Sequence, residues 1–265
     1  MRSLIITLGD DETSLAAALA SGADALVINL ELDTADARAA ARDAAARFLR
    51  QARVQGAAPA LIVRAAPLSG SGSETDLDLA AVMPAAPHAI MLPKSLGGAS
   101  VQHLSAKLAV HEALHGLADG ATKIIAEATD TAEALFGMAS YRGCSARLIG
   151  LAWGARTLSA DIGAEGHRDA SGGYAGPYRL ARDMTLVAAA AAGVAAIDAL
   201  FADVGNAEGL RAEAEAARRD GFAGKMAIDP DQARVINEVF LSRSIPRGQA
   251  DRANPNDGAP DSGIR

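Results

Sequence analysis

Short apolar runs alternate along the chain with longer segments in which apolar residues, mostly alanine, recur at helical spacing. Continuous apolar runs are typical of strands buried on both faces, and amphipathic stretches of ten residues or more are typical of helices. The pattern predicts strands over residues 3–8, 25–31, 60–65, 89–93, 123–128, 147–153, 195–201 and 225–228. It predicts helices between them, such as 36–55, 101–117, 131–141, 178–192 and 208–220.

Strict alternation of strands and helices indicates parallel pairing through right-handed crossovers. Eight such units in about 240 residues fit a closed (β/α)8 TIM barrel. The main alternative is an open doubly wound sheet, but no Gly-x-Gly-x-x-Gly turn follows the first strand. We therefore expect an α/β protein with one (β/α)8 barrel domain over residues 1–242.

Three segments depart from this alternation. The Ser/Gly-rich segment 69–75 and the Gly/Asp-rich segment 166–177 follow the third and sixth strands. Both are therefore expected at the C-terminal mouth of the barrel, where active-site loops lie. Residues 243–265 are poor in apolar residues and rich in Pro, Gly, Asp and Asn, which predicts a flexible C-terminal tail.

Composition narrows the classes of partner. The net charge of −7 argues against nucleic acid or an anionic membrane surface as the main partner. No uninterrupted apolar stretch is long enough to span a bilayer, and the N-terminal residues lack a signal-peptide pattern. Cys144 is the single cysteine, which excludes an internal disulfide and suits a reducing compartment. We expect a cytoplasmic protein that binds small molecules.

One stretch carries most of the chemical information. Arg147-Leu-Ile-Gly-Leu-Ala-Trp-Gly-Ala-Arg-Thr-Leu-Ser-Ala-Asp-Ile-Gly163 joins an apolar strand to a Gly-Ala turn and a Leu-x-x-Asp-Ile-Gly motif. It resembles the sixth strand and loop of the citrate lyase beta-subunit-like family, within the HpcH/HpaI aldolase superfamily. The resemblance covers roughly residues 2–242 and is strongest over 128–240, where segments 177–182 and 220–232 also match.

The resemblance implies an activity and an assembly. It implies a carbon–carbon lyase that cleaves or forms a 3-hydroxyacyl-CoA thioester, with a keto acid and an acyl-CoA as the other reaction partners. It implies Mg²⁺ as cofactor, an organic acid or acyl-CoA as ligand, and a homo-oligomer that is a trimer or a multiple of it.

The resemblance also implies roles for residues at strand ends. Arg64 matches the family's substrate-binding arginine, and Lys94 matches the lysine of its Leu-Pro-Lys, so both are candidate catalytic residues. Asp130 lies in a stretch similar to the family's Glu-Thr-Ala, whose glutamate binds metal; it is therefore a candidate metal and substrate ligand. Because Thr129-Asp-Thr-Ala-Glu133 is also typical of a helix start, a capping role for Asp130 is the alternative.

Several family acids are replaced. The family has Gly-Ala-Glu-Asp-Leu after the sixth strand, and its Asp binds metal, whereas this chain has Arg156 and Thr157 there, which changes the local formal charge from −2 to +1. Asn29-Leu-Glu-Leu32 replaces the family's Asp-Leu-Glu-Asp. Mg²⁺ is normally held by one or two carboxylates, so Asp130 with the weak neutral ligand Thr157 predicts weak metal dependence. Arg156 and Arg64 could instead hold a substrate carboxylate as bidentate forks.

A second motif points to different chemistry. His111-Glu-Ala-Leu-His115 matches His-Glu-x-x-His, which in zinc peptidases places two imidazoles on one helix face. Glu133 is the only plausible third ligand, and the helix is expected outside the barrel, far from the mouth. We expect a solvated helix face here rather than a zinc site.

Three hypotheses therefore remain: a thioester carbon–carbon lyase, a non-catalytic acyl-CoA or organic-acid binding relative without a metal site, and, remotely, a zinc peptidase. Asp198 and Asp203 follow the seventh strand and could be site residues or hydrogen-bond acceptors at the barrel mouth.

Overall fold

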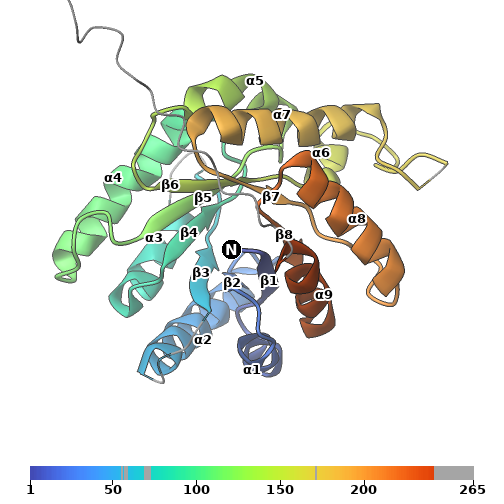
Figure 1. Cartoon of the computed structure of the whole chain (residues 1–265). Coiled ribbons are helices and arrows are strands. Elements are labelled where there is room, and N and C mark those ends of the chain that lie inside the picture. Colours follow the sequence, from blue (N-terminus) through green and yellow to red (C-terminus); the bar gives the residue numbers. More distant parts are fainter. Residues whose placement is uncertain (55, 57–58, 69–72, 171, 242–265) are drawn as a thin grey trace, which may run out of the picture.

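Eight parallel strands close into a barrel in the computed structural model, which describes residues 1–54, 56, 59–68, 73–170 and 172–241 (Figure 1). Each strand pairs with the next along the chain, and the last pairs with the first, so the predicted (β/α)8 fold is confirmed. The strands are β1 (Ser3–Leu8), β2 (Ala25–Asn29), β3 (Ala60–Arg64), β4 (Ala89–Leu92), β5 (Lys123–Glu127), β6 (Leu148–Ala152), β7 (Ala195–Asp198) and β8 (Gly224–Ala227).

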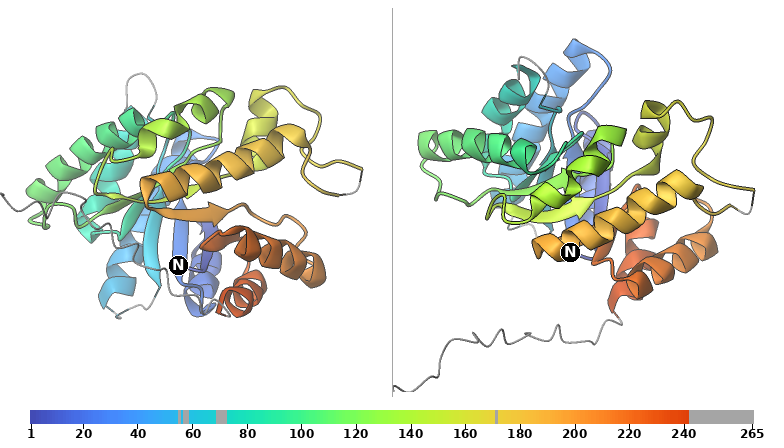
Figure 2. Two further views of the ribbon diagram at one scale, coloured as in Figure 1. Left: turned by 45° about the horizontal axis from the view of Figure 1, so that its top comes forward. Right: turned by 90° about the horizontal axis from the view of Figure 1, so that it is seen from above.

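Helices surround the strands as an outer layer (Figures 1 and 2). They are α1 (Glu12–Ala20), α2 (Ala35–Val54), α3 (Ser73–Val82), α4 (Gly98–Leu114), α5 (Ala132–Gly137), α6 (Ala155–Asp161), α7 (Gly176–Ala192), α8 (Ala207–Asp220) and α9 (Pro230–Leu241), with the short 3₁₀ helices η1 (Met83–Ala85) and η2 (Met138–Tyr141). None of the helices in the described part is both long and apolar enough to cross a membrane.

Alternation along each strand divides the core into two clusters. One set of strand residues fills the barrel interior, including Leu4, Val27, Ile62 and Ile125. The intervening residues pack against the helices in a larger cluster. Because side chains alternate with a period of two, the residues that end β2, β3 and β5 project into the interior at the mouth.

The helix predicted over residues 131–141 is wrong in its length. It divides into α5 and η2 at Gly137, where a β-carbon would collide with the carbonyl oxygen of Leu96. This close approach joins α5 to the loop that follows β4. Asp161 fixes the same region from α6, because its carboxylate accepts the backbone N–H of Ala132 at 2.7 Å. The Leu-x-x-Asp-Ile-Gly motif thus has a structural role at the start of α5.

The sequence pattern predicts bounds for only some of the helices. It gives none for α1, α3, α6 and α9. Part of the predicted loop 69–75 belongs to α3, which begins at Ser73, and residues 69–72 lie outside the described residues. The predicted loop 166–177 is largely observed, with an isolated bridge between Arg168 and Tyr174 and with α7 beginning at Gly176. The predicted tail 243–265 lies outside the described residues.

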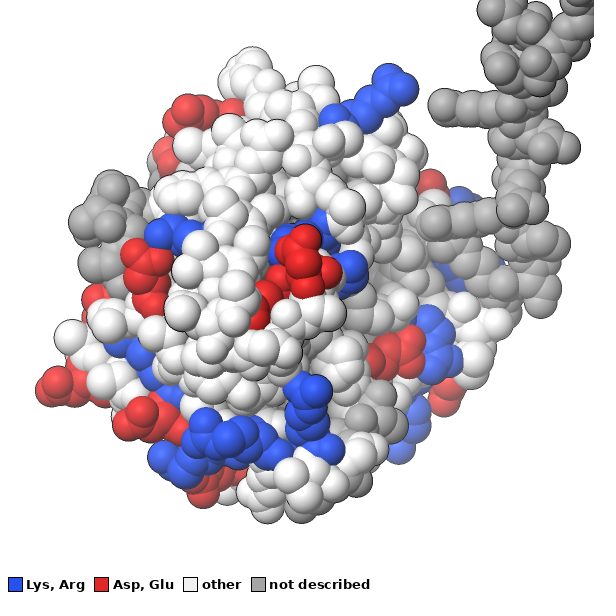
Figure 3. All heavy atoms as spheres, turned by 90° about the vertical axis from the view of Figure 1, so that its left-hand side faces the viewer, with Lys and Arg blue, Asp and Glu red and all other residues white. Residues whose placement is uncertain are grey.

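Charged side chains of both signs cover the outer surface. On the face shown in Figure 3, acidic and basic side chains lie beside one another in several groups. Salt bridges join neighbouring helices, for example Arg42 of α2 with Glu74 and Asp78 of α3. Asp78 also accepts the backbone N–H of Ala66 at 2.7 Å, so the α2–α3 pair holds the turn that follows β3.

Candidate functional site

Arg64 is the centre of a charged cluster at the barrel mouth. Its Nε lies 2.9 Å from Glu127 Oε1 and its Nη2 lies 2.8 Å from Glu127 Oε2, which is a bidentate pair across the barrel from β3 to β5. Its Nη1 donates to Asn29 Oδ1 at 3.2 Å and also pairs with Glu31. Its three nitrogens thus all donate to oxygens supplied by β2, β5 and the loop after β2.

The cluster carries more negative than positive charge. The Arg64 side chain is 14% exposed, Glu127 is 13% exposed, and Glu31 is 32% exposed. Burial opposes the charged form of Arg64, but Glu127 and then Glu31 outweigh it and raise the pKa of the guanidinium. Arg64 therefore stays protonated, and Glu31 is the partner most open to exchange with solvent or a ligand.

Asp130 lies beside Glu127 and holds the loop that follows β4. Its side chain is buried, and its Oδ2 accepts the backbone N–H of Lys94 at 2.9 Å. Burial, and then the charge of Glu127, raise the pKa of the Asp130 carboxyl to about 8. Near neutral pH the Asp130 carboxyl is therefore mostly protonated. The capping alternative for Asp130 is wrong, because Thr131 caps α5 by accepting from Ala134 N.

Lys94 has an unusual backbone and an exposed side chain. Its φ is 48°, in the left-handed region that non-glycine residues seldom occupy. Asp130 stabilises that conformation by accepting the Lys94 N–H. The same carboxyl thus contacts Glu127 and sets the backbone from which Lys94 projects, and residues in such strained conformations tend to lie at functional sites.

Arg156 and Thr157 lie in the first turn of α6, directly after the C-terminal end of β6. Arg156 is exposed, and it forms no hydrogen bond or ion pair with another described residue. Its charge acts on His167, whose pKa is lowered by burial and then by Arg168 and Arg156. The structure thus brings Arg64 and Asp130 together through Glu127, but it does not bring Arg156 into that cluster.

The mouth does not fit a tightly held divalent cation. Glu127 uses both carboxylate oxygens on Arg64, and the raised pKa of Asp130 favours its neutral form. At Thr157 a hydroxyl stands in place of a carboxylate. Among the described residues, no group of three or more His, Cys, Asp or Glu side chains is arranged to hold a metal. The donor set is therefore poor for Mg²⁺, which prefers ionised carboxylates.

Asp198 belongs to a buried ionic network outside the barrel rather than to its mouth. Ile197 fills the interior, so the next residue, Asp198, faces the helices. Its carboxylate accepts Trp153 Nε1 at 2.7 Å and Lys225 Nζ at 2.8 Å. Asp203 is exposed in the loop before α8. Asp198 is therefore a hydrogen-bond acceptor, but it lies between the barrel and the helices and not at the mouth.

The His-Glu-x-x-His segment is structural, and the expectation of a solvated face is wrong for its glutamate. Glu112 is 1% exposed and forms a bidentate pair with Arg147, with 2.7 Å from each nitrogen to its oxygen. It also accepts the backbone N–H groups of Gly120 and Thr122. Because Glu112 is buried and is also held by two backbone N–H groups, it cannot reach a metal-bound water, which argues against a zinc peptidase.

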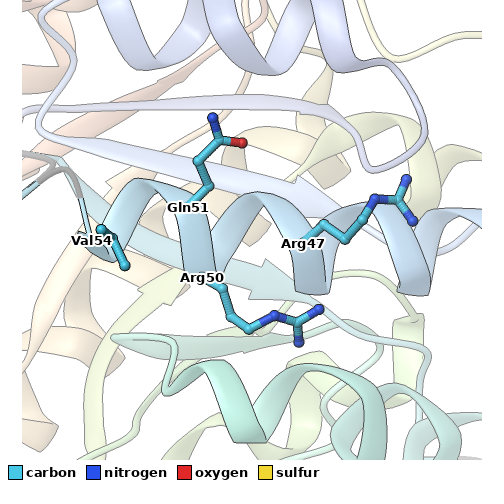
Figure 4. A pocket seen from close by; sticks show the side chains of 4 residues that line it. All are labelled: Arg47, Arg50, Gln51 and Val54. Carbon is cyan, nitrogen blue, oxygen red and sulfur yellow. The ribbon is translucent and has the colours of Figure 1, made fainter.

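A hollow of about 400 Å³ lies on the outer surface of α2 (Figure 4). Arg47, Arg50, Gln51 and Val54 line it, all from one helix, and their side chains extend in different directions. Polar groups that converge on one point are typical of ligand sites. The hollow lacks that convergence, so the charged cluster at the mouth remains the candidate site.

Sequence reasoning missed Glu127, the closest partner of Arg64. A signal for it was present: in the strand predicted over 123–128, positions 123, 125 and 127 share one face, and Glu127 ends that strand. An acid at the last inward position of a barrel strand is a candidate site residue whatever motif follows it.

Comparisons with known proteins agree with the fold. Residues 2–230 match the protein family described as HpcH/HpaI aldolase/citrate lyase. A citrate lyase subunit beta-like protein of Mycobacterium tuberculosis is 29% identical over 223 residues, which are 83% of this chain and 72% of that protein. A (3S)-malyl-CoA thioesterase of Cereibacter sphaeroides is 29% identical over 240 residues, 90% of this chain and 76% of that protein.

A solved structure is similar over most of its length. Protein CitE from Mycobacterium tuberculosis, in complex with magnesium, acetoacetate and coenzyme A, superposes with a TM-score of 0.70 at 27% identity. The match covers 90% of this chain and 80% of that one.

Proposed function

Because this chain belongs to the HpcH/HpaI aldolase/citrate lyase family, we propose that it is a carbon–carbon lyase acting on a 3-hydroxyacyl-CoA thioester. The products would be a keto acid and an acyl-CoA, and the reverse condensation would use the same site. The observation that carries the proposal is the Arg64 cluster, in which a guanidinium at the end of a barrel strand is directed into the mouth. Relatives that bind coenzyme A or act on malyl-CoA support the substrate class.

Arg64 would bind the carboxylate of the keto-acid half. A substrate carboxylate can replace Glu31, because Glu31 is the most exposed carboxylate of the cluster and is not bidentate. Glu127 would stay in place and hold the guanidinium plane, because it makes the bidentate pair from inside the barrel. Exchange of one carboxylate for another preserves the charge balance and makes binding depend on ligand geometry.

Glu127 and Asp130 would manage the proton. As the carbon–carbon bond breaks, the 3-hydroxyl proton passes to Glu127 and the electron pair of that bond becomes the thioester enolate. Asp130 then donates its proton to the enolate carbon. The proton that Glu127 accepted then passes to Asp130, which restores the starting state, and the raised pKa of Asp130 favours that return.

Loss of the proton acceptor provides the first test. Glu127→Gln should lower kcat by about 10²–10⁴ for cleavage of a 3-hydroxyacyl-CoA panel, because an amide cannot accept the proton. Asp10→Asn is a matched control, since Asp10 is an exposed acid directly after β1. Coupled detection of the released keto acid measures both variants. Equal kcat for Glu127→Gln and the unmodified chain would contradict the assigned role.

A second candidate function is binding of an organic acid or acyl-CoA without turnover. It is favoured by the poor donor set for a metal and by Thr157 and Arg156, which replace the acids of the related motif. In that case calorimetry would detect binding to the unmodified chain, Arg64→Ala would weaken it, and no keto acid would form.

Metal dependence separates this chain from relatives solved with magnesium. We expect EDTA to change thioester cleavage or ligand binding by less than about twofold, because both oxygens of Glu127 pair with Arg64 and Asp130 favours its neutral form. Arg156→Glu combined with Thr157→Asp should create Mg²⁺ binding that calorimetry detects. Micromolar Mg²⁺ affinity in the unmodified chain would show that the donor set has been misjudged.

A further inference from the structure

Two histidines lie on one face of α4 at its C-terminal end, outside the barrel. His111 is in the last turn of the helix, and His115 is its C-terminal cap residue. The backbone N–H of His115 donates to the carbonyl oxygen of His111 at 3.1 Å, so the helical turn that joins them is complete. Their ring centres are 6.2 Å apart, and their ring planes are inclined by only 20°. Glu112 between them is held by Arg147, whereas neither imidazole forms a hydrogen bond or ion pair with another described residue.

Each of the two imidazoles has a nitrogen available for a ligand. Nδ1 of His111 is enclosed by protein and has no hydrogen-bond partner, which leaves Nε2 as the nitrogen that a ligand can reach. His115 is exposed, so its side chain is free to rotate. A zinc ion lies about 2.0–2.1 Å from each imidazole nitrogen that binds it, so the two nitrogens must come within roughly 4 Å of each other. Because the rings are already nearly parallel and one turn apart, rotation of His115 towards His111 reaches that spacing.

Charged side chains near His111 come from α3 and α4. Asp76 of α3 accepts Lys107 Nζ at 2.6 Å, and Lys107 lies one turn before His111 on α4. Burial, and then the charge of His115, lower the pKa of His111, while Asp76 raises it and Lys107 lowers it to a smaller extent. The lowered pKa favours the neutral imidazole, which is the form that binds metals. The Asp76 side chain is 51% exposed, so its carboxylate is able to turn from Lys107 towards a cation.

The geometry points to a transition-metal site at the end of α4, in which His111 and His115 chelate one divalent ion of the kind that imidazole prefers, such as Zn²⁺. Asp76 adds negative charge beside the ion. Water completes the coordination, because no group of three or more His, Cys, Asp or Glu side chains in the described part of the chain is arranged to hold a metal. Mg²⁺ does not compete for this site, since it prefers oxygen ligands.

This site lies at the end of the barrel opposite the mouth. Glu112 of α4 accepts the backbone N–H of Thr122, the residue directly before β5, so the last turn of α4 lies beside the start of a strand. Arg64 and Glu127, in contrast, are the last residues of their strands. The ion therefore stabilises the last turn of α4 and takes no part in thioester chemistry. The inference does not rest on the proposed function.

Calorimetric titration of the full chain with Zn²⁺ alone tests the site. The unmodified chain should bind one ion with a dissociation constant in the micromolar range. His111→Ala and His115→Ala should each weaken binding by about 10²-fold, because a single imidazole loses the gain from two ligands on one rigid helix. His103→Ala is the matched control and should leave the affinity unchanged. His103 is exposed on the same face of α4, but it lies about 12 Å from His111 along the helix axis.

Lys107→Gln should strengthen Zn²⁺ binding by roughly two- to fivefold, because it removes a nearby positive charge and releases Asp76. Circular dichroism confirms that each variant is folded, and the exposed position of His115 makes His115→Ala the variant least able to disturb packing. Absence of Zn²⁺ binding to the unmodified chain up to millimolar concentration would overturn the proposal. So would an unchanged affinity in His115→Ala, or an equal loss in His103→Ala. Unchanged or weaker binding in Lys107→Gln would overturn the role given to Asp76.

Discussion

Replacing Lys225 with methionine should lower the free energy of unfolding by about 3–5 kcal/mol, because it removes one partner from a fully buried ionic network. Lys225 is 0% exposed, and its Nζ lies 2.8 Å from Asp198 Oδ2 and 2.8 Å from Glu213 Oε1. Methionine fills a similar volume, so the loss reports the charge and its hydrogen bonds rather than a cavity. Urea denaturation followed by circular dichroism measures the difference.

The loss is large because Asp198 would remain buried with less compensation. Burial opposes its ionised form, but the charges of Lys225 and then Arg182 hold the pKa of Asp198 below its usual value. Without Lys225, the carboxylate keeps Trp153 and Arg182, whose Nε is 3.3 Å away. Removing one member of a buried pair costs more than the pair contributes, since the other must stay desolvated or take up a proton.

The same network anchors the long segment between β6 and α7. Glu213 accepts Arg168 Nη2 at 3.0 Å, and the Arg168 guanidinium lies 3.8 Å from the centre of the Tyr174 ring. Tyr174 in turn packs edge-on against Trp153 at 4.8 Å. We therefore expect Lys225→Met also to increase proteolysis within residues 162–175, before global unfolding.

Lys123→Met is the matched control, because Lys123 begins β5 and is half-buried rather than enclosed. It should change stability by less than about 1 kcal/mol. The double variant Lys225→Met with Asp198→Asn should be less destabilised than the sum of the two single changes, since the pair is removed together. Equal stability of Lys225→Met and the unmodified chain would show that the network is not a stabilising feature.

The barrel could be predicted because the pattern that indicates it is repeated along the whole chain. Each strand is a short apolar run, each is followed by a helical segment, and eight repetitions leave few topologies. Errors arose where tertiary contacts override local pattern. Gly137 ends α5 because the chain passes close to Leu96, a neighbour from the loop after β4 that no local window contains.

The candidate site was predictable only in part, for a related reason. The family resemblance predicts Arg64 as a site residue at the end of a strand, and the structure places it at the mouth. Its partner Glu127 lies 63 residues away in sequence, so their pairing depends on barrel closure. Asp130 was assigned from a neighbouring motif, but its contact is the backbone of Lys94, another long-range partner. Residue type and strand position locate a site, whereas the pairing within it requires the fold.

Asp130→Asn should make stability depend less on pH, with the largest gain above pH 7. Asparagine has nearly the shape of the neutral acid, can still accept the Lys94 N–H, and can donate to Glu127 as the protonated carboxyl does. It removes the ionisation that burial and Glu127 disfavour. The free energy of unfolding of the variant, relative to that of the unmodified chain, should rise by about 2–4 kcal/mol between pH 5 and pH 8.

The direction follows from proton linkage. The folded chain holds the Asp130 proton up to about pH 8, whereas the unfolded chain releases it near the ordinary carboxyl pKa of about 4. The stabilisation from this group is therefore complete below about pH 4 and is lost as pH rises through about 8. Asparagine has no proton to lose, so the difference between the two proteins grows across that window and levels off above it.

Chemical denaturation at half-unit pH steps measures the difference, with Asp10→Asn as the exposed control. A flat difference between pH 5 and pH 8 would mean that Asp130 is ionised in the folded chain. The mouth would then hold an ionised Asp130 beside Glu127, and the argument against a divalent cation would fail with it. The same variant should lose thioester cleavage, because asparagine cannot protonate the enolate. A variant that is more stable but less active would indicate that the buried position of Asp130 serves its chemistry and costs the fold stability.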